Sequence, residues 1–428
     1  MKFKIKDNKF INNTSWMIAE RVYQIGISLV IGMLTARYLG PSNYGIINYI
    51  GAFISFVTPL CNLGFDEVLV KKYKDIPDEQ GDITGTAMFL ELISSVTISF
   101  LLVVLIYVIN WGDREKTIIA MLQSLYLVFK STEAIEFWYQ SRLEARYTSV
   151  IKIIGYTAMT VYRIILLITN KSVVWFGFAA SMDMLVIAAL YLLLYKSQHA
   201  PKLKVNFSIG KGLLSESYHF IVSGMMVVVY SQIDKIMIQH MLGDEQVGVY
   251  AAAHTICTLW LFVPTALIAS AKPVIFEAKK KNERQYLRRL KQLYAAIFWM
   301  GVAVGVLITI LSPFVINILY GKQYLGASGA LSIGIWYGAF AMLGSARSAW
   351  ILCEDKNKYI KYILFIGAII NVVLNYIWIK LWGINGAAFA TLITQMVTSI
   401  FAPLIFKETR IHTKILFEAI VFKGSKDE

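Results

Sequence analysis

The sequence predicts an all-α integral membrane protein with about 12 transmembrane helices in two six-helix lobes. Three observations favour this fold class: the composition, the length of the apolar segments, and a repeat between the two halves of the chain. Hydrophobic residues make up 57% of the 428 residues and charged residues only 16%. Soluble domains hold roughly 45–50% apolar and about 25% charged residues. The composition therefore excludes an ordinary soluble protein.

Apolar segments recur along the whole chain, separated by short polar stretches. About 20 apolar residues are enough to cross a bilayer as a helix. The first six predicted spans are 14–36, 44–63, 84–108, 117–138, 150–168 and 173–195. The second six are 218–237, 249–271, 294–319, 327–353, 359–379 and 386–406. Because the number of spans is even, both chain ends are expected on the same side of the membrane.

The distribution of Lys and Arg predicts which side that is. Of 41 such residues, six fall in one set of loops and five lie well inside the spans, which leaves 30 (41 − 6 − 5) at the opposite side. Positive charge collects on the cytoplasmic side of membrane proteins. Both termini are therefore expected in the cytoplasm. The net charge of +14 then reflects topology and attraction to anionic membrane lipid, and does not indicate a nucleic-acid partner.

A repeat relates the two halves. Leu39-Gly40 with Gly45 recurs as Leu242-Gly243 with Gly248, at an offset of 203 (243 − 40). A second set, Trp138, Tyr147 and Gly155, recurs as Trp350, Tyr359 and Gly367, at an offset of 212 (350 − 138). Two parallel six-helix repeats are a transporter architecture, with the substrate path between them. The predicted domains are an N-terminal lobe at 1–200, a linker at 201–217, a C-terminal lobe at 218–406 and a cytoplasmic tail at 407–428.

Basic residues inside the spans are candidates for substrate binding. A charge at the centre of a membrane helix costs about 2.5–3.5 kcal/mol and usually faces a cavity or a partner. One guanidinium group can donate two parallel hydrogen bonds to the oxygens of a phosphate, and it stays charged when partly buried. The candidates for a basic central cavity are Arg21, Lys130, Arg163 and Arg347. Each also has a structural interpretation: Lys130, for example, is three residues from Glu133 and can pair with it on one helix face.

Acidic residues inside the spans are candidates for coupling. Asp183 and Asp234 are interpreted as proton or cation sites, or as counter-ions to the arginines, and Glu20 is grouped with them. Lys235 lies near the outer end of its predicted helix, where a lysine can snorkel to the surface. The sequence leaves these alternatives open.

Motifs of nucleotide, zinc and nucleophile chemistry are absent from the sequence. It has no Walker motif, no His-Glu-x-x-His and no nucleophile elbow. The three cysteines are far apart, and no ligand cluster indicates a metal. We therefore expect neither an enzyme nor a cofactor, and transport would depend on an ion gradient, the membrane potential or consumption of the product.

Several short motifs, taken together, resemble a known family. They are Asn13-Thr14-Ser15-Trp16, Glu20-Arg21, Ala36 to Gly45, Leu63-Gly64-Phe65-Asp66-Glu67, Ile233-Asp234-Lys235-Ile236-Met237, Val247-Gly248-Val249-Tyr250, Asn371, Asn375 and Gly383 to Thr391. The chain resembles the bacterial polysaccharide repeat-unit flippases of O-antigen and capsule synthesis. That family shares a superfamily with the multidrug and toxin exporters (MATE) and the lipid II flippases.

The resemblance implies a MATE-like fold and a role in the bacterial plasma membrane. The substrate would be a polyprenyl diphosphate-linked oligosaccharide that enters from the inner leaflet, and the lobes would rock to release it outward. A coupling proton or sodium ion and a polysaccharide polymerase are possible partners. Lipid II flippases usually carry two further helices that this chain lacks, which disfavours the peptidoglycan precursor as substrate.

Three other functions stay open. A MATE-like multidrug or cation antiporter would share the fold but would need an acidic or apolar cavity. A membrane enzyme of polysaccharide assembly would need larger outer loops than this chain has. A scaffold without transport would have little use for charges inside the spans.

Overall fold

The computed structural model describes residues 6–198 and 200–422, and this part of the chain is helical with no strand. The predicted lobe and tail segments at 1–5, 199 and 423–428 lie outside the described residues. The chain folds as two compact units. Unit 1 comprises 1–39 and 46–228, and unit 2 comprises 40–45 and 229–428.

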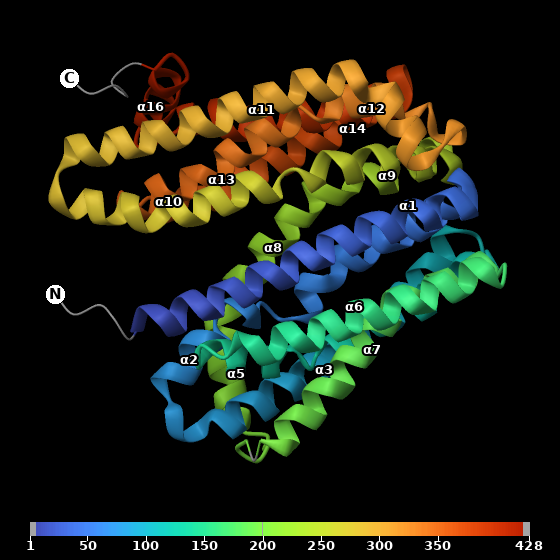
Figure 1. The fold of residues 1–428 in the computed structure, drawn as a ribbon, viewed down its shortest axis with the longest axis horizontal. Helices are drawn as coiled ribbons and strands as arrows, with labels where there is room; N and C mark the ends of the chain where they lie inside the picture. The colour runs from blue at the N-terminus through green and yellow to red at the C-terminus, as the bar shows by residue number, and fades with distance from the viewer. Residues whose placement is uncertain (1–5, 199, 423–428) are drawn as a thin grey trace. The chain divides into compact units, whose positions relative to one another are not determined.

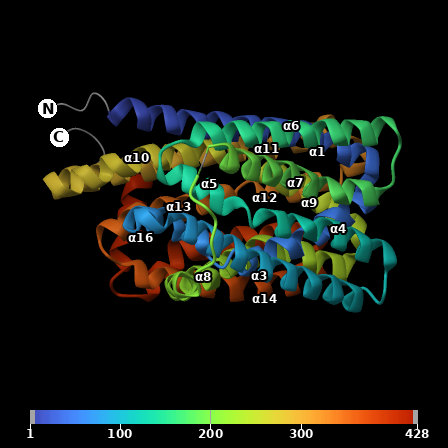
Figure 2. The same ribbon diagram turned by 90° about the horizontal axis from the view of Figure 1, so that it is seen from below.

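Unit 1 is a bundle in which the long helices pack side by side. Helix α4 packs against both α3 and α7, and α7 packs against α6. Figures 1 and 2 both show α6 running beside α7. Its core contains Phe65, Tyr73, Trp138, Tyr139 and Tyr191. The helices are α1 (Lys6–Cys61), α2 (Leu69–Asp75), α3 (Gln80–Ile109), α4 (Arg114–Lys130), α5 (Glu133–Ser141), α6 (Ala145–Ile168), α7 (Val173–Ser197) and the first part of α8 (Phe207–Leu242), with 3₁₀ turns at Phe65–Glu67 and Pro77–Glu79.

Unit 2 is built around α11, which packs on α10, α12, α13 and α16. Its core includes Tyr286, Tyr294, Trp350, Leu343 and Leu416. The helices are α9 (Asp244–Leu259), α10 (Phe262–Lys281), α11 (Glu283–Tyr320), α12 (Ala327–Gly334), α13 (Tyr337–Cys353), α14 (Ile360–Met396), α15 (Ala402–Ile405) and α16 (Arg410–Ile420), with 3₁₀ turns at Lys322–Tyr324 and Asn357–Tyr359 and a π-helix at Val397–Phe401.

Ten helical stretches in the described residues are long and apolar enough to cross a membrane. Two of them, Asn12–Cys61 with 50 residues and Ile360–Ile405 with 46, are too long for one crossing. At about 1.5 Å per residue they would span more than twice the roughly 30 Å hydrocarbon core. Each is interrupted by non-helical backbone, at Gly40 and at Trp382–Gly383. Each therefore supplies two spans, which gives the predicted twelve (10 + 2).

Helix α14 illustrates this reversal. Contacts join Gly386 to Trp378, Asn371 to Thr394, and Gly367 to Thr398. All three pairs are centred on residues 382–383, which is the pattern of two antiparallel helices joined by a tight turn. The polar residues on either side of this turn therefore face one another.

The two copies of the glycine motif meet inside unit 2. Gly40 (φ 74°, ψ 170°) and Gly243 (φ 90°, ψ 175°) have nearly the same backbone conformation, one that is essentially restricted to glycine. A Cβ added at Gly45 would lie 1.8 Å from the carbonyl oxygen of Asp244, and one added at Gly248 would lie 1.9 Å from that of Pro41. The contact is thus reciprocal, and only glycine permits so close an approach. We refer to it as the glycine crossing.

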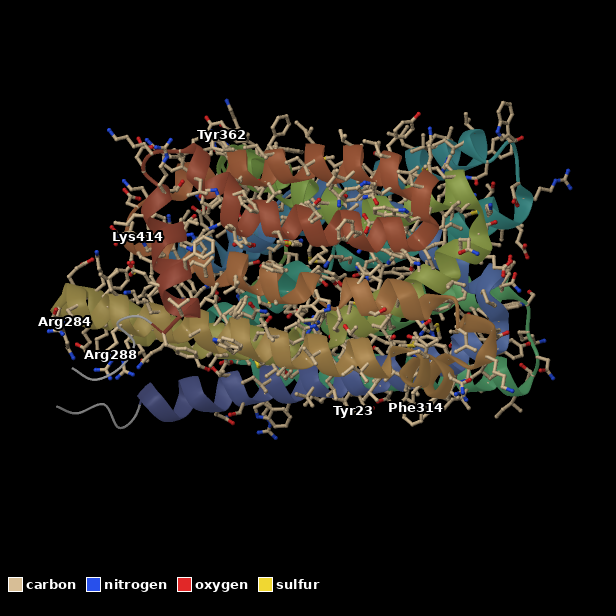
Figure 3. All side chains as sticks on the ribbon, turned by 90° about the horizontal axis from the view of Figure 1, so that it is seen from above. Tyr23, Arg284, Arg288, Phe314, Tyr362 and Lys414 are labelled. Carbon is tan, nitrogen blue, oxygen red and sulfur yellow. The ribbon has the colours of Figure 1, made fainter. Side chains whose placement is uncertain are left out.

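Basic side chains mark one end of unit 2. Figure 3 shows Arg284 and Arg288, at the start of α11, at the same end as Lys414 on α16. Phe314 extends outward from α11, as a side chain that faces lipid would, whereas the hydroxyl of Tyr23 on α1 lies 2.7 Å from that of Thr157 on α6. Phe314 is 63% exposed, which is an ordinary value for a lipid-facing residue and a high one for a soluble core helix.

Candidate coupling and substrate site

The carboxylate of Asp234 lies at the centre of a buried polar network in unit 2. Asp234 is only 2% exposed. The hydroxyls of Tyr250 and Thr391 donate to its Oδ2 over 2.6 and 2.7 Å, and Asn375 Nδ2 donates to its Oδ1 over 3.2 Å. Every hydrogen-bond donor to this carboxylate among the described residues is therefore neutral.

Two more side chains extend the network along α14. Asn375 Nδ2 also donates to Asn371 Oδ1 over 3.0 Å, and Asn371 Nδ2 donates to Thr394 Oγ1 over 3.3 Å. Asn371 and Asn375 are one helical turn apart, so they share a face, and the reversal at Gly383 brings Thr391 and Thr394 opposite them. The Asp234 network comprises Asp234, Tyr250, Asn371, Asn375, Thr391 and Thr394.

The Asp234 network has the chemistry of a small-cation or proton site. Asn375 Oδ1 is buried and accepts no hydrogen bond from the residues that the structure describes. Carboxylate, amide and hydroxyl oxygens are the ligands that hard cations prefer. A buried carboxylate is expensive to keep ionised without a positive partner. A proton or a metal ion of low charge would neutralise the carboxylate, and Asn375 Oδ1 leaves one further oxygen of the network without a donor among the described residues.

Unit 1 holds a second group of buried charges. Lys152 Nζ lies 2.6 Å from Glu136 Oε1, and Tyr191 OH donates to Glu136 Oε2 over 3.0 Å. Glu20, which is 8% exposed, lies within electrostatic reach of Lys152 and Glu136. The structure therefore brings the predicted Glu20 together with Glu136 and Lys152, from α1, α5 and α6.

The other predicted residues of unit 1 are placed separately. Lys130 pairs with Glu133, but across the break between α4 and α5 rather than along one continuous helix. Asp183 accepts from its neighbour's backbone N–H over 2.7 Å and lies within electrostatic reach of Arg163. Arg21 donates from Nη1 to Gln24 Oε1 over 2.6 Å and is exposed.

Arg347 is enclosed in unit 2. It is 6% exposed, and its Nη1 donates to the carbonyl oxygen of Thr398 over 2.6 Å. Thr398 belongs to the π-helix at Val397–Phe401. In this conformation the guanidinium thus stabilises irregular backbone, since π-helical turns leave carbonyl groups in need of a donor.

Sequence reasoning assigned no chemical role to Tyr250, Asn371, Asn375, Thr391, Glu136 or Lys152. The signal available for the asparagines was their spacing: two amides four residues apart in an apolar span lie on one face. The ion pair of Glu136 and Lys152 had no such local signal, because its members come from different helices.

Comparisons with known proteins agree with this fold. Residues 10–279 match the family described as "Polysaccharide biosynthesis protein", and residues 220–377 match the MatE family. The chain is 24% identical over 207 residues to a putative O-antigen transporter of Salmonella typhi (46% of this chain and 46% of that protein). It is 24% identical over 176 residues to the probable flippase AglR of Haloferax volcanii (40% and 37%). Each match thus spans less than half of the relative's own length.

Solved structures share the fold over nearly the whole chain. An inward-facing multidrug resistance MATE family transporter of the MOP superfamily aligns with a TM-score of 0.73 at 15% identity, covering 92% of this chain and 96% of that one. The lipid II flippase MurJ, in an inward closed conformation, aligns with a TM-score of 0.64 at 16% identity, covering 96% and 90%. The two-lobe, MATE-like fold expected from the sequence is therefore confirmed. With residues 10–279 matched, this multi-pass membrane protein belongs to the polysaccharide biosynthesis protein family.

Proposed function

We propose that this protein is a flippase that moves polyprenyl diphosphate-linked oligosaccharide from the inner to the outer leaflet of the bacterial plasma membrane. The observation that carries the proposal is the family match over residues 10–279, together with relatives named as an O-antigen transporter and a flippase. The product would supply surface polysaccharide synthesis, where a polysaccharide polymerase consumes it.

Transport would proceed by alternating access through a basic central cavity between the predicted lobes at 1–200 and 218–406. Arg21, Lys130, Arg163 and Arg347 are the proposed ligands of the substrate. Glu20 and Asp183 are proposed as counter-ions that hold these cations in apolar surroundings. Since Arg347 is enclosed and Lys130 is paired in the present conformation, both would need a rearrangement to reach the substrate.

Asp234 is the proposed coupling residue. The buried network around it supports this role, because it offers oxygen ligands and an unpaired amide oxygen but no cation in hydrogen-bond contact among the described residues. A proton or sodium ion bound there would link an ion gradient to the conformational change.

The test uses a bacterial strain that lacks its own repeat-unit flippase. Wild type is expected to restore surface polysaccharide, and Asp234→Asn and Arg21→Ala are expected to reduce it at equal protein level. Asp78→Asn is the matched control, because Asp78 is exposed in a 3₁₀ turn. Failure of wild type with several matched repeat units would contradict the proposal.

A MATE-like antiporter is the second candidate function. The match of residues 220–377 to the MatE family and the fold shared with a MATE transporter favour it. In the same strain, raised resistance to cationic drugs without restored polysaccharide would identify this activity.

A further inference from the structure

Helix α16 carries large apolar side chains on two sides. On one side, Leu416 and Ala419 are buried in the core of unit 2. On the other, Ile411, Phe417 and, just after the helix, Val421 are 58%, 52% and 69% exposed. Packing on unit 2 therefore accounts for only one side of the helix. Large apolar side chains left uncovered beside cationic ones mark a surface that contacts a membrane or a partner.

Hydrogen bonds fix the position of α16 at the end of a predicted span. The hydroxyl of Thr409 donates to the carbonyl oxygen of Pro403 over 2.6 Å, and that of Thr413 donates to the carbonyl oxygen of Ile400 over 3.1 Å. Both acceptors belong to the last part of the apolar stretch Ile360–Ile405, and α16 begins five residues after it (410 − 405). The helix is therefore expected to lie at the bilayer surface, where the chain leaves the hydrocarbon region.

Five exposed cations come from α16 and from the start of α14. Arg410 and Lys414 are one turn apart on α16 and share a side of it, and Lys407 directly precedes the helix. Lys358 and Lys361 stand where α14 begins. Among the residues that the structure describes, no ion pair joins any of the five to an acidic side chain. Their charges are therefore available to an anionic partner.

Aromatic rings join the two basic segments. The ring centroid of Phe406, next to Lys407, lies 5.2 Å from that of Tyr359 and 5.9 Å from that of Tyr362. The ammonium nitrogen of Lys361 lies 5.1 Å from the ring centroid of Tyr362. Figure 3 shows Tyr362 at the same end of unit 2 as α16. Tyrosine rings beside cations are typical of the interface between membrane and water.

We propose that this surface binds anionic phospholipid of the leaflet that borders it. The apolar side chains would enter the acyl region, while the lysines and the arginine reach the phosphates. Lipid is favoured over an acidic protein segment because the surface adjoins the end of a span. The proposal concerns lipid that surrounds the protein and does not rest on the proposed function. The surface, called the α16 patch, comprises Lys358, Lys361, Lys407, Arg410, Lys414, Ile411, Phe417 and Val421.

The test compares phosphatidylglycerol, which is anionic, with phosphatidylcholine, which is zwitterionic. Binding of each to the purified full-length protein in neutral detergent is measured by native mass spectrometry. A variant that combines Lys361→Gln, Lys407→Gln and Lys414→Gln is expected to bind phosphatidylglycerol at least tenfold more weakly, because each cation near an anionic headgroup contributes to the attraction. Its binding of phosphatidylcholine should not change. Arginine at the same three positions keeps the charge and should retain the preference for phosphatidylglycerol.

The matched control removes the same charge from unit 1. It combines Lys71→Gln, Lys74→Gln and Lys211→Gln, at three exposed lysines on the same predicted side of the membrane. This variant should bind phosphatidylglycerol as wild type does. Equal weakening by the two triple variants, or no preference of wild type for the anionic lipid, would overturn the α16 patch. Thermal midpoints measured without added lipid report whether each variant is folded.

A second measurement tests whether the apolar side chains enter the bilayer. In a variant without the native cysteines, Val421→Cys is labelled with an environment-sensitive fluorophore and placed in nanodiscs that contain phosphatidylglycerol. Lipids with brominated acyl chains should quench the fluorescence, and aqueous iodide should not. Quenching by iodide without quenching by the brominated lipids would place this side of α16 in water and would contradict the proposal.

Discussion

At the scale of single residues, His412 is a titratable group that is buried in the core of unit 2. It lies in α16 and is 1% exposed, with Nε2 3.0 Å from the hydroxyl of Tyr294. Its ring also lies 5.4 Å from that of Trp350. Burial, and then the nearby positive charge of Arg347, hold the pKa of His412 well below its usual range. Near neutral pH the histidine is therefore uncharged in the folded protein.

This environment makes stability depend on pH. Because the folded pKa lies below the unfolded value of about 6.5, the unfolded state binds more protons between the two values. The contribution of His412 to stability is therefore complete above about pH 6.5 and declines as the pH falls below it. The thermal midpoint of the detergent-solubilised protein should drop from pH 7.5 to pH 5.5, and His412→Phe should reduce that drop. An identical drop in wild type and His412→Phe would contradict the assignment.

At the scale of elements, turns and breaks determine where side chains meet. The reversal at Gly383 folds α14 on itself, so that Asn375 and Thr391 converge on Asp234. Lys130 is the last residue of α4 and Glu133 the first of α5, so their ion pair connects the two helices across the break between them. Small changes in the backbone at such points move several polar contacts at once.

The glycine crossing should be intolerant of any side chain. Gly45→Ala and Gly248→Ala place a methyl group within 2 Å of a carbonyl oxygen, and overpacking of this kind costs about 1–3 kcal/mol or more. Both variants should lower the thermal midpoint. Gly51→Ala, in the same helix as Gly45 but with no atom within 4 Å of the added Cβ, should leave it unchanged or raise it slightly. A wild-type midpoint for Gly45→Ala would contradict the tight contact.

At the scale of the whole molecule, topology follows from the charge on the loops. Both termini and the basic segment near Lys281 are predicted to lie in the cytoplasm, and Lys171 is predicted to lie outside. In a variant without the native cysteines, single cysteines at these two positions can be labelled in intact cells with a membrane-impermeant maleimide. Both lysines are exposed, so accessibility does not bias the comparison. Labelling at Lys171→Cys but not at Lys281→Cys is expected, and the reverse pattern would invert the topology.

The fold was largely predictable because its determinants are local in sequence. Apolar run length gave the spans, and the Gly40 and Gly243 motifs marked the repeat. The candidate site was less predictable, because its contacts join residues that are far apart in the sequence. Asn375 and Asp234, for example, are 141 residues apart. The apolar pattern of the sequence predicts that Asp234 lies on a helix. It does not predict the contacts of Asp234 with Tyr250 and Thr391, because tertiary packing brings these residues together. Glu136 is buried against Lys152 for the same reason.

The reciprocity of the glycine crossing has an evolutionary consequence. Gly45 contacts the segment of Gly248, and Gly248 contacts that of Gly45, which is the signature of an isologous contact in a homodimer. A chain formed by duplication of such a dimer keeps that contact inside one polypeptide. Each copy of the motif then limits how far its counterpart can diverge, since a side chain gained on one side intrudes on the backbone of the other. The two positions are in effect one shared constraint, and substitutions at them should combine non-additively.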